Sequence, residues 1–275
     1  MYRDCKMNVD VKKKKVLLEL LSSCNLNCRH CFYRASSKFH SPDFLSKENI
    51  LKLIDRFVEN DITKLVLTGG EPTLHPSFVE ISKYAMSKFP KVSLCTNGVV
   101  LNKNLENKVI ELNFSTYTVS IDSHIDKIHD EFRGRNGALQ KTIQFLQKLK
   151  SKNRNTSIHI TIHPNNIDHI EDTIEFCKKL SSEIVVGSIY YDKLYMDPGT
   201  IAEYDKAIKK FRQKHISRTD IILVGFEPSC ISKNCLDQKN VFMINREGEL
   251  INCYWKKNGG KVVKTFHQLL NTKKI

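Results

Sequence analysis

The chain has 275 residues, of which 40% are apolar and 27% charged, and its formal net charge is +14. This length allows one large core with a small appendage. No apolar run is long enough to span a bilayer, and the basic N-terminus lacks a signal-peptide core, so membrane insertion and secretion are not expected. The nine cysteines fit metal or cluster binding in a reducing cytoplasm better than disulfides.

The positive charge is scattered along the chain, apart from the run at 12–15. A nucleic acid, a nucleotide or an acidic peptide would suit such a charge. The scatter favours a compositional origin instead, with weak steering of anionic substrates as a by-product. Neither a membrane nor a nucleic acid is therefore expected as a partner.

Short β-like runs alternate with helix-like stretches along most of the chain. The first strand is predicted at 16–21, and the first helix follows with Ser46 as its N-cap and Asn49 at its third position. Further strands are predicted at 64–68, 91–96, 116–122, 157–163 and 183–191. Further helices are predicted at 76–88, 104–112, 137–150 and 170–180.

Six successive βα units imply a parallel sheet with right-handed crossovers, and hence an α/β fold of the partial (β/α)6 TIM-like barrel kind. In such barrels ligands gather at the C-terminal ends of the strands. The unusual residues all lie there, in four segments that we expect to form one site. These segments are the cysteine loop at 24–31, Gly69–Gly70–Glu71–Pro72, Thr96–Asn97–Gly98 and Ser120–Ile121–Asp122.

The predicted organisation has three parts: a basic tail at 1–15, the partial barrel at 16–191, and a small C-terminal region at 192–275. The last part opens with a linker at 192–200 and continues with a helix at 202–216, a strand at 220–226 and a hairpin at 241–255. Gly248 suits the positive φ that the hairpin turn requires. The C-terminal region is too short to fold alone without an additional cross-link, such as a bound cluster.

Three cysteines fall within eight residues, as Cys24-x3-Cys28-x2-Cys31. A structural zinc ion would need a fourth protein ligand. An iron–sulfur cluster is also held by thiolates, and three of them would leave one iron open. The triplet alone leaves both possibilities standing.

Three neighbouring side chains are expected to be structural. His75 is predicted to cap the following helix, Cys95 to be a buried strand thiol, and Cys177 to lie on an amphipathic helix without a role in binding. If Cys95 faced the barrel interior, its thiol would be placed to donate a hydrogen atom to a substrate radical.

The cysteine triplet combined with Gly69–Gly70–Glu71–Pro72, Thr96–Asn97–Gly98, Ser120–Ile121–Asp122 and Arg133 closely resembles the radical S-adenosylmethionine (SAM) superfamily. The resemblance covers roughly residues 16 to 190. It implies a [4Fe–4S] cluster on Cys24, Cys28 and Cys31, with S-adenosyl-L-methionine chelating the open iron. It also implies that Phe32, the aromatic residue that follows the motif, binds the cofactor as a wall of its pocket, together with His30.

The resemblance further suggests which residues contact S-adenosylmethionine. The Gly69–Gly70 backbone and the Glu71 carboxylate would hold its ammonium group. Ser120 and Arg133 match cofactor contacts of relatives with the pattern "SID…HD..RG", and a guanidinium suits a carboxylate. Thr96 and Asn97 would line the same pocket. No catalytic side chain is assigned.

A second cysteine group, Cys230, Cys235 and Cys253, resembles the start of a SPASM or twitch domain, which carries an auxiliary [4Fe–4S] cluster. The hairpin at Gly248 would bring Cys253 back toward Cys235. No further cysteine follows Cys253, so a second auxiliary cluster is not expected. A non-cysteine fourth ligand, an open iron, a structural zinc or a decayed site are the alternatives.

The function that the resemblance implies is generation of a 5′-deoxyadenosyl radical that abstracts hydrogen from a substrate. Maturation of a ribosomal peptide or protein is the leading prediction, with flavodoxin or ferredoxin as electron donor and the cytoplasm as compartment. The barrel begins near residue 16, so no leader-binding winged helix is expected before it. The alternatives are a dehydrogenase of a small molecule, such as an aminosugar or a nucleotide, and a non-catalytic zinc protein that binds nucleic acid.

Overall fold

The computed structural model describes residues 14–31, 44–100, 102–188, 198–224, 241–251 and 262–272. Phe32 and the three C-terminal cysteines, Cys230, Cys235 and Cys253, lie outside the described residues. In the part of the chain that is described, no helix is both long and apolar enough to cross a membrane.

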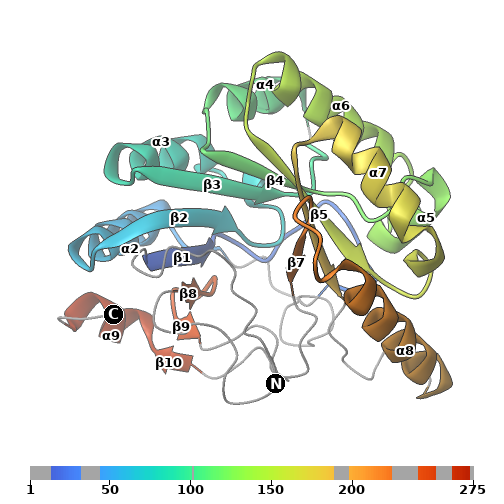
Figure 1. The fold of residues 1–275 in the computed structure, drawn as a ribbon. Helices are drawn as coiled ribbons and strands as arrows, with labels where there is room; N and C mark the ends of the chain where they lie inside the picture. The colour runs from blue at the N-terminus through green and yellow to red at the C-terminus, as the bar shows by residue number, and fades with distance from the viewer. Residues whose placement is uncertain are drawn as a thin grey trace.

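The described strands form one 10-stranded sheet in the order β10-β9-β8-β1-β2-β3-β4-β5-β6-β7 (Figure 1). The six predicted strands are present in sequence order and pair in parallel. They are β1 (Lys14–Glu19), β2 (Ile62–Thr68), β3 (Lys91–Thr96), β4 (Thr116–Ser120), β5 (Thr156–Ile162) and β6 (Glu183–Ser188). This confirms the α/β fold with a parallel sheet.

The parallel part of the sheet is wider than the six predicted strands. β7 (Ile222–Val224) extends it beyond β6, and β8 (Val241–Ile244) extends it beyond β1. Both strands lie within segments predicted as a strand at 220–226 and a hairpin at 241–255, but these were expected in the C-terminal region and not in the barrel sheet.

Helices cover the convex, outer side of the sheet (Figure 1). They are α2 (Lys47–Glu59), α3 (Phe78–Lys88), α4 (Lys103–Glu111), α5 (Asp126–Arg133), α6 (Ala138–Ser151), α7 (Ile170–Leu180), α8 (Pro198–His215) and α9 (Phe266–Asn271). Two short 3-10 turns, Pro72–Leu74 and Ile167–His169, follow β2 and β5.

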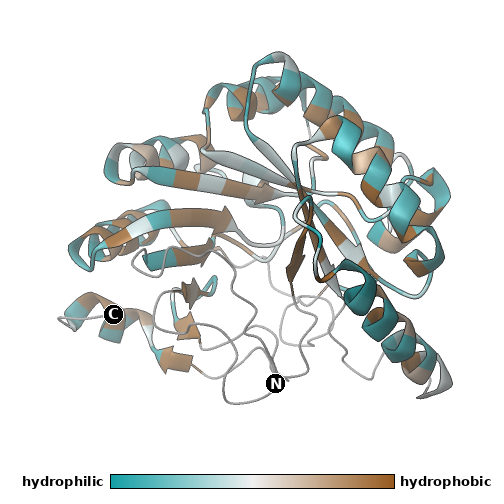
Figure 2. Ribbon diagram, viewed as in Figure 1, coloured by the Kyte–Doolittle hydropathy of each residue, from teal (hydrophilic) through white to brown (hydrophobic). Residues whose placement is uncertain are grey.

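The core lies between the strands and these helices. Alternate residues of each strand point to the helices, so Val16, Leu18, Leu65 and Leu67 are completely buried. Figure 2 shows this as brown apolar bands along the strands and on the inward sides of the helices. The other residues of the same strands face the concave side of the sheet, where any bound substrate of a partial barrel would lie.

Local sequence signals account for several boundaries. The Ser46 side chain accepts a hydrogen bond from the Asn49 amide, which confirms Ser46 as the N-cap of α2. The linker predicted at 192–200 is too long, because α8 already begins at Pro198. Proline is favoured in the first turn of a helix, where its missing N–H would have no partner.

The C-terminal hairpin is confirmed. β8 pairs antiparallel with β9 (Leu250–Ile251), and Gly248 in the turn has a φ of 77°. β9 in turn pairs with β10 (Val262–Lys264). Because β8 also pairs with β1, this hairpin continues the barrel sheet.

Candidate active site

The cysteine loop follows β1 and is held by the C-terminal end of α5. The Asn27 amide donates to the Arg133 carbonyl at 3.0 Å, and the Arg29 amide donates to the Phe132 carbonyl at 2.8 Å. The last carbonyls of a helix have no partner within the helix, so an adjoining loop can use them as anchors. These two bonds hold the backbone of the loop on the end of α5.

A glycine pair after β2 packs directly on the start of the same loop. A Cβ on Gly70 would lie 2.2 Å from the Ser23 carbonyl oxygen, and one on Gly69 would lie 2.5 Å from that of Leu21. The Gly70 amide donates to the Leu21 carbonyl at 2.8 Å. Glycine is therefore required at 69 and 70 even without a ligand, because any side chain there would clash with the backbone of Leu21–Ser23.

Glu71 joins the ends of β2 and β3. Its Oε1 accepts bonds from the Thr73 and Thr96 hydroxyls at 2.7 and 2.8 Å and from the Thr73 amide, while Oε2 accepts one from the Asn97 amide at 2.9 Å. Burial raises the pKa of Glu71, and these donors oppose the rise. Oε2 retains acceptor capacity for one more donor.

Asn97 connects this junction to the cysteine loop. Its Nδ2 lies 3.6 Å from the Cys24 sulfur and donates to the Asn25 side chain at 2.9 Å. Its Oδ1 accepts the Val99 amide, which orients the side chain. The Cys24 sulfur thus has an amide donor from the neighbouring strand end.

Asp122 and Arg133 form a buried ion pair beside the second cysteine. Arg133 Nε donates to Asp122 Oδ2 at 2.5 Å, and Arg133 Nη1 lies 3.9 Å from the Cys28 sulfur. Burial would raise the pKa of Asp122, but the Arg133 guanidinium outweighs it, so the pKa of this carboxyl lies well below its usual range. The pair places a fixed positive charge next to a predicted cluster ligand.

Two histidine rings stack on the Phe132 ring, close to the cysteine loop. His30 stacks on Phe132 with ring centroids 4.5 Å apart, and His163 stacks on Phe132 with centroids 3.6 Å apart. His30 sits between two of the cysteines, whereas His163 follows β5. The stack therefore ties the cysteine loop to the end of a distant strand.

The three thiols are free and lie in or near the protein interior. Burial raises the pKa of Cys24 to about 12 and also raises that of Cys28, so both thiols are protonated until a metal displaces the proton. The described residues contain no group of three side chains converged around a single metal ion. A cubane cluster does not need such convergence, because each thiolate binds a different iron.

The structure brings most of the predicted site residues together. One hydrogen-bonded chain links Glu71, Thr96 and Asn97 to Cys24, and a second links Arg133 to Cys28. Ser120 ends β4, two residues before Asp122, and is partly exposed. The roles predicted for these residues toward S-adenosylmethionine remain predictions.

Sequence reasoning also missed residues of this site. Asp122 was placed in the "SID" segment, but its pairing with Arg133 was not predicted, and Asn25 and His163 were not singled out. The available signal was that Asp122 stands eleven residues before Arg133. This spacing predicts a contact only when the position of α5 is known. The helix placement predicted for Cys177 is confirmed, since it is buried on α7. The capping role predicted for His75 is wrong: Ser77 is the N-cap of α3, and the His75 ring accepts the Ser77 amide from the turn before the helix.

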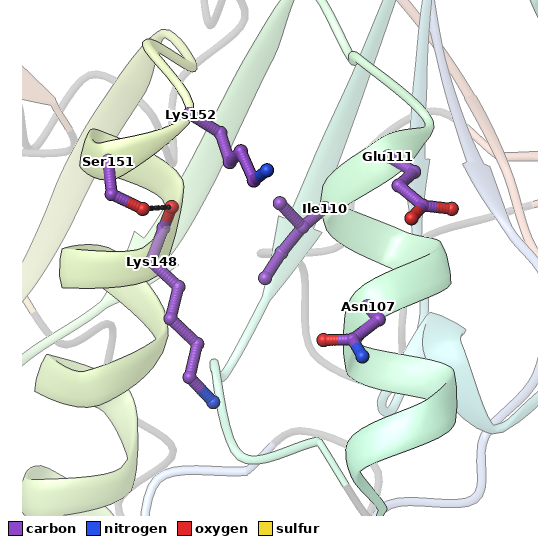
Figure 3. Close-up of a pocket in the computed structure, with 6 residues that line it drawn as sticks. All are labelled: Asn107, Ile110, Glu111, Lys148, Ser151 and Lys152. Carbon is purple, nitrogen blue, oxygen red and sulfur yellow. Dashed lines mark hydrogen bonds between the residues drawn. The ribbon is translucent and has the colours of Figure 1, made fainter.

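A separate hollow of about 290 Å³ lies between α4 and α6 (Figure 3). It is lined by Asn107, Ile110, Glu111, Lys148, Ser151 and Lys152. These residues lie on the outer helical layer, away from the C-terminal strand ends. The hollow is therefore distinct from the candidate site.

Comparison with known proteins identifies the family. Residues 18–177 match the model of the radical SAM superfamily, which is more than half of the chain. This chain belongs to the radical SAM superfamily.

Two relatives illustrate the range of named activities. The chain is 30% identical over 180 residues to an AdoMet-dependent heme synthase of Methanosarcina barkeri, covering 66% of this chain and 50% of that protein. It is 31% identical over 160 residues to the sporulation killing factor maturation protein SkfB of Bacillus subtilis, covering 58% and 38%. The match thus spans no more than half the length of either relative.

Solved structures share the fold. Streptococcus suis SuiB bound to the precursor peptide SuiA matches with a TM-score of 0.72 at 13% identity, covering 94% of this chain and 64% of that one. The enzyme anSMEcpe with bound AdoMet matches with a TM-score of 0.65 at 17% identity, covering 94% and 80%. At these identities the likeness establishes the partial-barrel architecture.

Proposed function

We propose that this protein is a radical SAM enzyme that modifies a peptide or protein. The observation that carries the proposal is the cysteine loop of a superfamily member, held in place by α5 and flanked by hydrogen-bond donors to two of its sulfurs. The donor set fits an iron–sulfur cluster, because its three ligands are thiols without disulfide partners. Cys24, Cys28 and Cys31 would hold the cluster.

When bound, the cluster and S-adenosyl-L-methionine supply a one-electron cleavage that yields a 5′-deoxyadenosyl radical able to take hydrogen from a substrate. The chain's own residues orient the reactants and tune the cluster. Donors near the Cys24 and Cys28 sulfurs stabilise negative charge on the thiolates. Hydrogen bonds to sulfur are one of the levers by which proteins set cluster potential.

The contacts of Glu71 and Arg133 are compatible with the cofactor roles proposed for them. Glu71 Oε2 has a free acceptor position for the methionine ammonium, beside the Gly69–Gly70 backbone. Arg133 uses Nε and Nη1 on Asp122 and Cys28, and no described residue bonds Nη2, which we assign to the methionine carboxylate. Ser120 and Thr96 complete the proposed pocket.

The peptide substrate is proposed from the relatives. SkfB is named as a maturation protein, and the SuiB structure contains a precursor peptide. A small-molecule substrate is the second candidate, favoured by the relatives named as heme synthases and by one named GTP 3′,8-cyclase. A peptide precursor encoded beside the gene would support the first candidate.

Three further parts of the proposal rest on the family. An auxiliary [4Fe–4S] cluster on Cys230, Cys235 and Cys253 is proposed from their spacing, in a segment outside the described residues. A flavodoxin or ferredoxin is proposed as electron donor. A reducing cytoplasm is the compartment that suits such clusters.

The proposal is tested by anaerobic purification and reconstitution, followed by incubation with a reductant and S-adenosylmethionine. Formation of 5′-deoxyadenosine and the spectrum of a [4Fe–4S] cluster are expected. Co-expression with a neighbouring short peptide should then change the mass of that peptide. A colourless protein that carries zinc and no iron would refute the proposal and support a zinc-binding function.

A further inference from the structure

The concave side of the sheet carries an unusual row of lysines near its N-terminal edge. Lys15 on β1 pairs in register with Lys64 on β2, and Lys64 pairs with Lys91 on β3. Val16 and Leu65 point to the helices, so the alternation of the strands turns these lysines to the concave side. We call Lys15, Lys64 and Lys91 the lysine ladder.

An irregularity in strand pairing creates the ladder. Lys14 pairs with Ile62, whereas Lys15 pairs with Lys64, so the register shifts between the two and Thr63 is skipped. Regular pairing would have set Lys15 opposite Thr63. β-bulges recur next to functional sites, where they re-aim a side chain.

The ladder has no counter-charge in the described structure. None of its three amino groups forms an ion pair or a hydrogen bond with a described residue, whereas the neighbouring Lys14 donates to the Asn60 carbonyl at 2.8 Å. Like charges opposite each other on adjacent strands are destabilising. Burial lowers the pKa of Lys15, and the charge of Lys64 lowers it further.

A second polar group points to the same place. Ser93 lies two residues beyond Lys91 on the same side of β3, is only 4% exposed, and its Oγ has no hydrogen-bond partner among the described residues. A buried hydroxyl without a partner is uncommon, and it is able to donate a hydrogen bond to an anionic oxygen. An anion between the lysines and this hydroxyl would satisfy both.

We propose that the lysine ladder binds the anionic group of the substrate, either a carboxylate or a phosphate. The assignment of the anion to the substrate depends on the proposed function. The existence of an anion site depends only on the lysine ladder. Lys15 lies four residues before Glu19 at the end of β1, which is roughly 13 Å at about 3.3 Å per residue. The ladder would hold one end of a substrate whose reacting atom lies at the cysteine-loop edge.

The first test uses wild-type reconstituted protein and trace labelling of lysine amines with acetic anhydride, read by peptide mass spectrometry. Inorganic pyrophosphate and glutarate are the two probes, and the exposed Lys52 on α2 is the internal control. At about ten times its dissociation constant, a bound anion should slow labelling of Lys15 and Lys64 about tenfold and leave Lys52 unchanged. Unchanged labelling of Lys15 with both probes would overturn the proposal.

The second test measures the affinity of the protecting probe by calorimetry in variants. Lys64→Gln should weaken it about tenfold, whereas Lys64→Arg should largely retain it because the charge remains. Lys52→Gln should bind like the wild type. Equal affinity in Lys64→Gln and the wild type would refute the ladder.

The choice of probe separates the two anion classes. Protection by pyrophosphate alone indicates a phosphate-bearing substrate, and protection by glutarate indicates a carboxylate, as on an acidic peptide. Formation of 5′-deoxyadenosine in the same wild-type preparation is scored separately. Its failure would contradict the proposed function, and failure of protection would contradict only the ladder.

Discussion

Asp122 and Arg133 form an ion pair in which the carboxylate is completely buried and the guanidinium side chain is 8% exposed. The pair joins the end of β4 to the end of α5, and its arginine reaches the Cys28 sulfur. The same ion pair therefore connects β4 to α5 and holds the Arg133 guanidinium beside the Cys28 sulfur. Removing one partner of this buried pair should cost far more stability than removing one partner of a surface ion pair.

Asp122→Asn should destabilise the protein by about 3–5 kcal/mol, because it leaves a buried guanidinium without its counter-charge. The double variant Asp122→Asn/Arg133→Met should be less destabilised, since the unpaired charge is also removed. Urea unfolding followed by circular dichroism measures both. Equal losses in the single and double variants would contradict the account.

Replacing Cys24, Cys28 and Cys31 together by alanine should remove one cluster's worth of iron and sulfide. Chemical iron and sulfide assays on anaerobically reconstituted protein measure the loss, and Cys177→Ala, buried on α7, is the control that should keep its iron. Iron that remains in the triple variant would support the auxiliary cluster on Cys230, Cys235 and Cys253. A triple variant without iron would remove that assignment.

Gly70→Ala should cost more than 2 kcal/mol and lower iron occupancy, because the new methyl group meets backbone oxygens of the cysteine loop. Gly137→Ala is the matched comparison: φ is 74°, but nothing lies within 4 Å of the added carbon. It should cost only about 1 kcal/mol, from backbone strain. Thermal unfolding and iron assays measure both effects. Equal stability and equal iron occupancy in the two variants would contradict the steric role of Gly70.

Asn97→Ala should make the cluster harder to reduce, because the amide near the Cys24 sulfur no longer stabilises added negative charge. If that donor contributes about 1 kcal/mol more to the reduced state, the midpoint potential falls by about 40 mV. Thr142→Val is the control, since it removes the bond to the Asn97 carbonyl without touching sulfur. A redox titration followed by electron paramagnetic resonance decides, and an unchanged potential in Asn97→Ala would count against the donor.

Stability should fall as the pH drops from about 6.5 to 4. His129 and His163 are buried, and burial lowers the pKa of each to about 4 from the ordinary 6.5. Between these values the unfolded chain binds protons that the folded chain does not, so each histidine costs about 1.4 kcal/mol per pH unit of acidification.

His163→Gln should reduce the slope of unfolding free energy against pH by about that amount. Urea unfolding at several pH values measures the slope. At pH values above 7 the wild type and the variant should show the same pH dependence, because both states are then neutral at this position. An unchanged slope below 6.5 would show that His163 does not carry the effect.

The site could be located from the sequence because its signals are local. Parallel strands end at one edge, so residues that follow Thr68, Thr96 and Ser120 had to meet there. Cysteine spacing within one loop needed no long-range information. The contacts within the site were not predictable in the same way, since Asp122 reaches Arg133 only through the position of α5, a short and highly charged helix.

The lysine ladder was hidden for a related reason. Three lysines at 15, 64 and 91 look like ordinary members of a basic chain. Only the register of β1 on β2, shifted between Lys14 and Lys15, sets them side by side. Register depends on the packing of whole strands, which no single segment encodes.

The anchoring of the cysteine loop on α5 bears on how the protein is supplied with iron. The amides of Asn27 and Arg29 are bonded to helix carbonyls, so two of the contacts that hold the loop on α5 do not involve iron. Delivery can then follow synthesis instead of accompanying it. A molecule that loses its metal to oxygen can be refilled in place, without returning through the unfolded chain.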